Sequence, residues 1–267
     1  MRWVKAVVYY VTSVIKMLVG FKNWPAVVPF FLGTRANQQL RLQLRRPQVA
    51  LIVRSAMDIW SVKETFLDQF YTRYGVPVED GWTVMDIGAG IGDYAILAAY
   101  GKPNVQVYAF EPYPGSFGLL LENLALNQMD QVRAFQQAVW HTTGALSLDL
   151  ANGEPLQISS HNLTSSVSDG YRLSVDAISL ESALAKLNIT RLDLLKMDCE
   201  GAEYEILLNT PPEILRLVKR IIMEYHDLDA QRAHPILVDF LQQQGYQVTR
   251  QENNVHAEIG YLYAEQK

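Results

Sequence analysis

The chain has 267 residues, 49% of them hydrophobic and 19% charged, and this ordinary globular composition excludes a disordered, collagen-like or fibrous protein. The single cysteine, Cys199, excludes a disulfide framework and a cysteine-rich zinc site, and it fits a reducing compartment. The net charge of −5 conceals an asymmetry, because nine Lys or Arg residues and no Asp or Glu lie between Met1 and Arg54. The remainder of the chain, residues 55–267, has 14 Lys or Arg residues and 28 Asp or Glu residues, so a basic arm precedes an acidic body.

Residues 1–35 make up this arm, and its beginning has helical spacing. Lys5, Tyr9, Thr12 and Lys16 share one face of such a helix, and aliphatic side chains cover much of the rest. Ten uncharged residues separate the two lysines, about half of the ~20 needed to cross a bilayer. The pattern is typical of a helix lying on an anionic membrane, with its lysines toward the headgroups. Alternatively, the helix packs its apolar face on the protein or on a second copy, or it is a signal peptide, although no small-x-small cleavage site follows.

Residues 36–78 are expected to form a β-hairpin and a helix before the core. Leucines alternate with polar residues over 40–45, and a second apolar stretch covers 49–53, which predicts the hairpin. Apolar residues recur at helical spacing over 56–71, which predicts one helix.

Residues 79–267 alternate short β-rich runs with helical ones, which predicts an α/β domain with a mostly parallel sheet. The segment 153–170 is rich in Ser, Asn, Thr and His, and we expect it to form a long loop, a kind of segment that often covers an active site.

A glycine-rich turn follows the first predicted strand of this domain. The strand covers 82–87, Gly88, Gly90 and Gly92 come next, and a helix is predicted from residue 94. Glycines at a strand-to-helix turn let a ligand approach the backbone closely. The next predicted strand ends in Glu111, and an acid at that position can accept both hydroxyls of an adenosine ribose.

The spacing of the glycines favours S-adenosylmethionine (SAM) over a nicotinamide dinucleotide. The dinucleotide fingerprint is GxGxxG, but position 93 is Asp, so the run is GxGxG. Asp93 would also repel a pyrophosphate at the start of the helix. A cofactor with a cationic sulfonium suits an acidic loop better, whereas a glycine turn serving only packing is the alternative without a ligand.

Two runs resemble a known family. The run DIGAGIG at 86–92, with AFEP at 109–112, resembles motif I and the acidic strand end of class I SAM-dependent methyltransferases, and LLKMDCEGAE at 194–203 resembles the signature of the FkbM branch. The resemblance covers about 40–263, although Glu181 stands where the family often has Asp. It implies a Rossmann-like seven-stranded sheet with helices on both faces, preceded by the helical arm and the hairpin.

The resemblance also implies the cofactor site. Gly88, Gly90 and Gly92 would line the methionine and ribose of SAM, and Glu111 would hold the ribose hydroxyls. Asp86 would steady the loop and approach the amino group, and we add Asp198 to this set.

Polar residues at the ends of two later strands are candidates for catalysis. Lys196 and Asp198 close one apolar run, and Glu224 and His226 close the next. Parallel strands would bring both ends to the edge that carries the glycine loop. Transfer of a methyl group to a hydroxyl requires alignment and removal of a proton. His226 is the best candidate for the base because its ordinary pKa is about 6.5, and Asp198 could be the base or orient the acceptor.

Two other interpretations of these residues remain open. Asp198, Glu200, Glu224 and His226 could supply ligands to Mg²⁺ or Mn²⁺, although we predict no metal. Lys196 and Glu200 could also form a structural ion pair, since alternation places them on one side if the strand extends that far.

We therefore predict a SAM-dependent methyltransferase of FkbM type that methylates a hydroxyl on a sugar, a glycolipid or a secondary metabolite. It would be cytoplasmic and peripheral to the inner face of a membrane, with residues 1–35 contacting the membrane or a second copy. The alternatives are a non-catalytic scaffold with the same fold and an NAD-dependent oxidoreductase. The acidic body argues against a nucleic-acid substrate.

Overall fold

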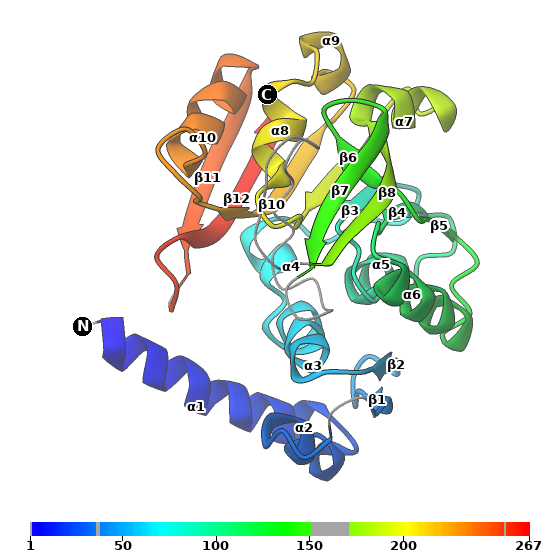
Figure 1. Ribbon diagram of the computed structural model, residues 1–267, viewed down its shortest axis with the longest axis vertical. Coiled ribbons are helices and arrows are strands. Elements are labelled where there is room, and N and C mark those ends of the chain that lie inside the picture. The colour runs from blue at the N-terminus through cyan, green and yellow to red at the C-terminus, as the bar shows by residue number, and fades with distance from the viewer. Residues whose placement is uncertain (1, 36–37, 151–170, 254) are drawn as a thin grey trace.

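The computed structural model describes residues 2–35, 38–150, 171–253 and 255–267, and its centre is a seven-stranded sheet (Figure 1). The strands are β3 (Thr83–Ile87), β4 (Gln106–Phe110), β5 (Val132–Phe135), β9 (Leu194–Met197), β10 (Arg220–His226), β11 (Tyr246–Glu252) and β12 (Ile259–Gln266). Their order is β11-β12-β10-β9-β3-β4-β5, and β12 runs antiparallel to the other six strands. This confirms the predicted seven-stranded Rossmann-like sheet.

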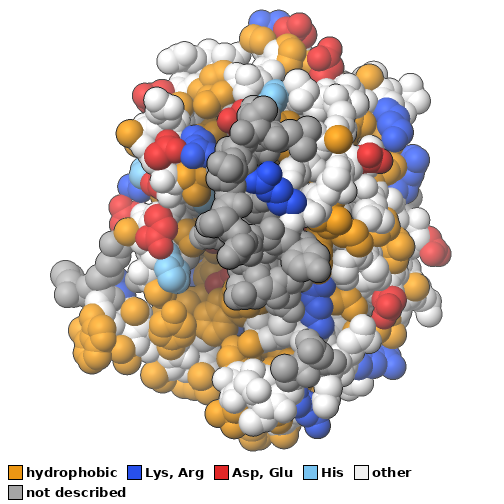
Figure 2. All heavy atoms as spheres, in the orientation of Figure 1, with side chains coloured by type: hydrophobic (Ala, Val, Ile, Leu, Met, Phe, Trp, Pro, Cys, Tyr) orange, Lys and Arg blue, Asp and Glu red, His pale blue; other side chains and the backbone are white. Residues whose placement is uncertain are grey.

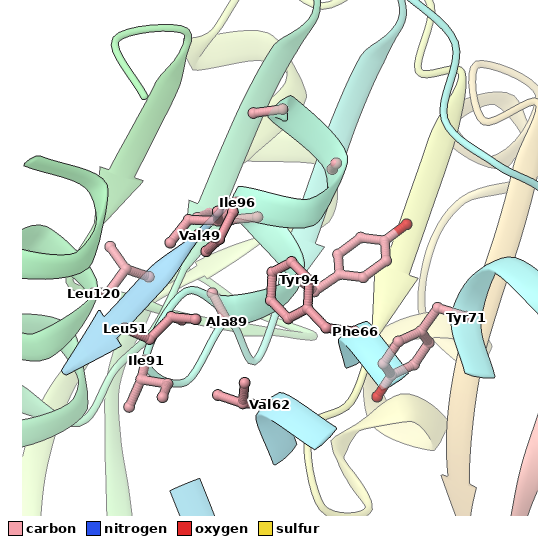
Figure 3. Close-up of a cluster of buried hydrophobic side chains, with 14 of the residues drawn as sticks. Val49, Leu51, Val62, Phe66, Tyr71, Ala89, Ile91, Tyr94, Ile96 and Leu120 are labelled. Atoms are coloured by element: carbon pink, nitrogen blue, oxygen red, sulfur yellow. The ribbon is translucent and has the colours of Figure 1, made fainter. Parts of the chain in front are cut away.

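Each face of the sheet carries its own hydrophobic core, because successive residues of a strand point to opposite faces. Val84 and Val107 enter the first core, with α5 (Asp93–Ala99) and α6 (Pro114–Leu126). Figure 3 shows part of this core. Met85 and Tyr108 enter the second core. The helices contributing to the second core are α7 (Leu180–Lys186), α8 (Ala202–Leu208), α9 (Pro212–Leu215) and α10 (His234–Gln243).

The segment before the sheet contains the predicted hairpin, formed by β1 (Leu40–Gln43) and β2 (Ala50–Val53). The single helix predicted over 56–71 is wrong, since the chain forms α3 (Ala56–Lys63), a π-helix η2 (Glu64–Asp68) and α4 (Phe70–Tyr74). A π-helix connects residues five apart, and the buried Lys63 Nζ lies 2.6 Å from Asp68 Oδ2 at that separation.

A second sheet, which the sequence patterns do not predict, packs on the second core. Its strands are β6 (Ala138–Trp140), β7 (Gly144–Leu150) and β8 (Tyr171–Ser179), in the order β6-β8-β7. The predicted loop over 153–170 lies outside the described residues.

The arm begins with α1 (Arg2–Gly20), which runs along the lower edge of the molecule in Figure 1. The short helices η1 (Trp24–Ala26) and α2 (Val28–Phe31) follow, and Phe21, Val27 and Phe30 anchor the arm in the first core. Lys16 is half-exposed, but its Nζ is bound to the protein, donating to Asp68 Oδ1 at 2.5 Å, rather than free for headgroups as expected. The apolar face of α1 does not pack on the protein either, and most of its aliphatic side chains are exposed.

Candidate functional site

The carboxyl ends of the parallel strands surround a cavity of about 520 Å³. The cavity lies beside β3, where the strand order reverses. Strands β4 and β5 follow on one side of β3, and β9 and β10 lie on its other side. Open α/β sheets bind ligands at such a switch point. The predicted residues Gly88, Gly90, Glu111, Lys196, Asp198, Glu224 and His226 line the cavity.

The three predicted glycines have different surroundings. A Cβ on Gly88 would lie 1.9 Å from the carbonyl oxygen of Asp198, so this glycine permits two backbone segments to touch. Gly90, at φ +54°, has open space where a Cβ would be, and it lines the cavity. Gly92 is the N-cap of α5 and packs toward Leu120 rather than lining the cavity. Gly90 is therefore the glycine whose missing side chain leaves room for a ligand.

Glu111 follows β4 and lies against the glycine loop. Its Oε2 accepts from the backbone N–H of Gly90 at 2.8 Å, and its Oε1 accepts from that of Tyr113 at 2.9 Å. Burial raises the pKa of Glu111 to about 7, against the lowering effect of these two hydrogen bonds. A carboxylate fixed beside an open glycine loop can accept hydrogen bonds from a ligand's hydroxyls.

Asp86 and Lys196 are neighbours on β3 and β9, and they form a buried ion pair. The Lys196 Nζ lies 3.0 Å from Asp86 Oδ1 and donates to the carbonyl of Gly88 at 3.0 Å. Burial alone would lower the pKa of Lys196, but Asp86 and Asp198 outweigh that effect and raise it. Asp86 is fully buried and does not line the cavity, so its observed contact is with Lys196.

Asp198 begins the segment that follows β9. The strand ends at Met197, and Glu200 has φ +54°, so strand alternation does not extend to Asp198 and Glu200. The suggested ion pair between Lys196 and Glu200 is therefore wrong, and Lys196 pairs with Asp86. Asp198 Oδ2 accepts from the hydroxyl of Tyr71, at 2.8 Å.

His226 ends β10 between two glutamates. Its Nε2 lies 3.6 Å from Glu200 Oε2, and its Nδ1 lies 3.5 Å from Glu203 Oε1. Burial lowers the pKa of His226, but the two carboxyls outweigh burial and raise it to about 10. The imidazole is therefore protonated at neutral pH in this arrangement, unlike the neutral base that its ordinary pKa suggested.

Glu224 lies two residues earlier on β10, and the same cavity contains its carboxyl. Burial, together with the nearby Asp198, raises its pKa well above the ordinary value. Burial likewise raises the pKa of Glu200 to about 7. Several carboxyls here thus hold protons more tightly than in water, which is expected where buried acids outnumber the cations near them.

Three of the four possible metal ligands come together. Atoms of Asp198, Glu200 and His226 lie within 4.8 Å of one another, whereas Glu224 is not part of this group. A divalent ion would have to displace the proton from His226, because an imidazolium offers no lone pair. These three residues could hold a metal only in that altered protonation state.

Sequence reasoning missed two side chains that shape the site. Tyr71, from α4, was included only in a helical stretch, and nothing local links it to a residue 127 positions later. Glu203 stands in the run 194–203 with no role of its own assigned, yet it is fully buried, accepts from the backbone N–H of Cys199 at 2.9 Å and faces His226. An acid within an apolar helix face was the available signal for Glu203.

The cavity fits a cationic adenosine cofactor on two grounds. Gly90 leaves an open cradle beside the Glu111 carboxyl. Acids outnumber bases in the cavity wall. A positive charge bound there would favour the ionised carboxylates and so lower the raised pKa values of Glu111, Glu200 and Glu224. The same excess of acids would repel an anionic pyrophosphate.

Comparisons with known proteins identify the family of the chain. Residues 86–248 match the model of the methyltransferase FkbM domain. The 31-O-demethyl-FK506 methyltransferase FkbM of Streptomyces tacrolimicus is 25% identical over 220 residues, covering 73% of this chain and 84% of that protein. The hexuronic acid methyltransferase AglP of Haloferax volcanii is 26% identical over 223 residues, covering 80% and 84%. The 2-O-methyltransferase NoeI of Sinorhizobium fredii is 25% identical over 158 residues, covering 54% and 63%.

Among solved structures, the methyltransferase FkbM from Methylobacillus flagellatus has a TM-score of 0.44 at 14% identity, covering 69% of this chain and 44% of that one. Because the family match spans more than half of the sequence, the chain belongs to the FkbM family of SAM-dependent methyltransferases.

Proposed function

We propose that the protein transfers the methyl group of SAM to a hydroxyl oxygen of a sugar or another small-molecule acceptor. The observation that carries this proposal is the acidic cluster at the ends of β9 and β10, in the same cavity as Gly90 and Glu111. Three relatives named as a hexuronic acid methyltransferase, a 2-O-methyltransferase and a 31-O-demethyl-FK506 methyltransferase support the acceptor class.

We assign cofactor binding to Glu111 and the loop at Gly90, with Gly88 and Gly92 shaping that loop. Asp86 and Lys196 act as positioning residues, since the pair ties the loop to β9 through the carbonyl of Gly88. When bound there, SAM would supply an electrophilic methyl group on its sulfonium sulfur for transfer to the acceptor oxygen.

The acceptor hydroxyl must lose its proton, and we propose that Asp198 is the base that accepts it. Tyr71 fixes one carboxylate oxygen of Asp198, and a carboxylate oxygen of this residue lies within 4.8 Å of ligand atoms of Glu200 and His226. His226 then acts as an imidazolium that orients the carboxylates, because Glu203 and Glu200 keep it protonated. Burial and the nearby Asp198 raise the pKa of Glu224, which favours its protonated form, and that form can donate a hydrogen bond to the acceptor.

The test uses tritium-labelled SAM and methyl α-D-glucuronoside as the probe acceptor. We expect a labelled product that survives alkaline hydrolysis, because an ether is stable to base whereas a methyl ester is not. Asp198→Asn should reduce kcat about a hundredfold and leave SAM affinity within about threefold. Base-labile label would reassign methyl transfer to a carboxyl group, and unchanged turnover in the variant would remove Asp198 from the mechanism.

We also propose that no divalent metal takes part, since both ring nitrogens of His226 already face carboxylates, Nε2 toward Glu200 and Nδ1 toward Glu203. Neither Mg²⁺ nor Mn²⁺ should raise the melting temperature, and dialysis against EDTA should leave turnover unchanged. Loss of turnover that either metal restores would place an ion at Asp198, Glu200 and His226.

A further inference from the structure

The α1 helix is docked by its polar side, which is the reverse of the usual arrangement. The Tyr9 hydroxyl donates to Glu64 Oε1 at 2.6 Å, Lys16 contacts Asp68, and Ser13 is buried. The outward side is apolar, and its exposed members are Trp3, Val4, Val7, Val8, Val11, Val14, Ile15, Leu18 and Val19. Contiguous apolar surface of this kind marks an interaction site.

The exposed apolar surface continues past α1. Trp24, Val28, Phe31, Leu32 and Met57 are also exposed, and Figure 2 shows hydrophobic side chains gathered at the lower left, where Figure 1 places α1. We call these residues and the outward side of α1 the apolar face.

The charge around the apolar face suits an anionic bilayer. Lys5, Lys22 and Arg35 are exposed on the same segment, and the sequence contains no acid before Asp58. An anionic surface attracts this arm and repels the acidic body, so the charges alone orient the molecule. A second copy packed on the same face would bring two basic arms together, which opposes self-association.

A groove of about 580 Å³ lies beside the apolar face, and its wall is mostly apolar. Leu18, Val28, Phe31 and Leu32 line it. The groove shares five lining residues with the cofactor cavity, namely Met57, Trp60, Glu64, Asn253 and His256. A hydrocarbon chain in the groove would thus place its polar end toward the acidic cluster.

We propose that the acceptor hydroxyl is carried by a membrane lipid, whose hydrocarbon chain occupies this groove while the apolar face lies in one leaflet of an anionic bilayer. The assignment of the acceptor rests on the methyl transfer proposed above. The helix Trp3–Gly20 is long and apolar enough to cross a membrane by length and composition. Its polar side is bound to the protein at Tyr9 and Lys16, however, and this favours a position in the plane of the membrane.

The first experiment tests the apolar face with the full chain and vesicles. We expect flotation with phosphatidylcholine vesicles containing a quarter of phosphatidylglycerol, and weaker flotation without the anionic lipid. Val8→Glu with Ile15→Glu, two exposed positions that line neither cavity, should reduce flotation about tenfold or more. The matched control is Tyr100→Glu with Leu121→Glu, which places two charges on exposed apolar positions of α5's end and α6.

The second experiment tests the groove with alkyl β-D-glucosides below their micelle concentrations. Affinity should rise about fourfold for each methylene that the groove buries. Val28→Trp, which fills the groove, should remove this dependence on chain length, whereas Val19→Trp lies outside the groove and should keep it. Unchanged circular dichroism and SAM titration of each variant show that the fold is intact.

Several results would overturn the proposal. Equal flotation of the wild type and the double glutamate variant would remove the membrane contact. A dimer that dissociates in that variant, without any flotation, would assign the apolar face to a second copy. Equal affinity for methyl and decyl glucoside would remove the hydrocarbon chain from the groove. Absence of SAM binding, with flotation retained, would instead contradict the proposed function and leave the membrane contact standing.

Discussion

At the scale of single residues, Gly88 and Gly90 lie two positions apart in one loop and meet different constraints. Gly88 is required by the protein's own backbone, because a Cβ there would lie 1.9 Å from the carbonyl oxygen of Asp198. Gly90 has nothing within 4 Å of the same position, so its small size serves the cavity. Substitution with alanine should therefore separate folding from binding.

We expect Gly88→Ala to lower the free energy of unfolding by about 3 kcal/mol, since the backbone must move to relieve the overlap. Gly90→Ala should lower it by only about 1 kcal/mol, the strain of a left-handed alanine, while weakening SAM binding about tenfold or more. Urea denaturation and calorimetric titration measure the two effects. Equal losses of stability in both variants, with SAM binding kept in Gly90→Ala, would contradict this division.

Glu111 should couple SAM binding to pH. Its pKa is raised by burial from 4.5 to about 7, so between these values the folded protein holds a proton that the unfolded chain has lost. The free energy of unfolding of the ligand-free protein should therefore fall as pH rises through this window. SAM affinity should rise over the same window, because a cationic ligand favours the ionised carboxyl.

Titration at about pH 5.5 and about pH 7.5 checks this, with Glu111→Gln as the comparison. The variant should bind SAM weakly and with less dependence on pH. Part of the dependence remains in the variant, because burial also raises the pKa of Glu200 to about 7. SAM affinity that increases toward acid pH in the wild type would reverse the sign and contradict the argument.

At the scale of elements, a buried polar network joins α1 to the α3–η2 segment. The Tyr9 hydroxyl donates to Glu64 and accepts from the Lys63 Nζ at 2.8 Å, and Asp68 pairs with both Lys63 and Lys16. Lys63 also lies 4.2 Å from the ring centroids of Tyr9 and Trp60. Helix α1 is thus attached through these polar contacts and through the buried Met17, which leaves most of its aliphatic side chains exposed.

Tyr9→Phe should loosen α1 without unfolding the core. The change leaves a buried lysine and a buried carboxyl each short of one partner, at a cost of about 1 to 3 kcal/mol. Amide exchange should accelerate in α1 and η2 while the central strands stay protected. Tyr10→Phe, at the neighbouring exposed tyrosine, is the matched control. Unchanged exchange in α1 would show that the network does not hold the helix.

The elements also show how far sequence patterns reach. Strands β3, β4, β9 and β10 could be predicted, because their apolar runs and the glycine turn are local. The π-helix could not, since helical spacing does not distinguish it from an α-helix and its Lys63–Asp68 ion pair is buried inside the fold. Helical spacing placed Tyr9 and Lys16 on one face, but it did not show that this face binds the protein. The same holds for the site: the contact between Tyr71 and Asp198 could not be predicted, because the two residues are 127 positions apart in the sequence.

At the scale of the whole molecule, the predicted boundary at residue 79 separates parts that share one core. Leu42 and Leu51 of the hairpin are fully buried in the first core with Val84 and Ile96. The side chain of Asn123, on α6, accepts from the backbone N–H of Ile52 at 2.6 Å. We therefore propose that residues 38–78 fold with the core as one unit.

Two truncated chains test this proposal. A chain starting at residue 79 should fail to unfold cooperatively, because it would expose the core surface that the hairpin and α3 cover. A chain starting at Gly20 should keep cooperative unfolding and SAM affinity within about threefold, since Phe21, Val27 and Phe30 remain to close the core. Its melting temperature should fall, because Glu64 and Asp68 lose their partners on α1. Cooperative unfolding of the shorter chain would establish the boundary at residue 79 and make the hairpin an accessory to the domain.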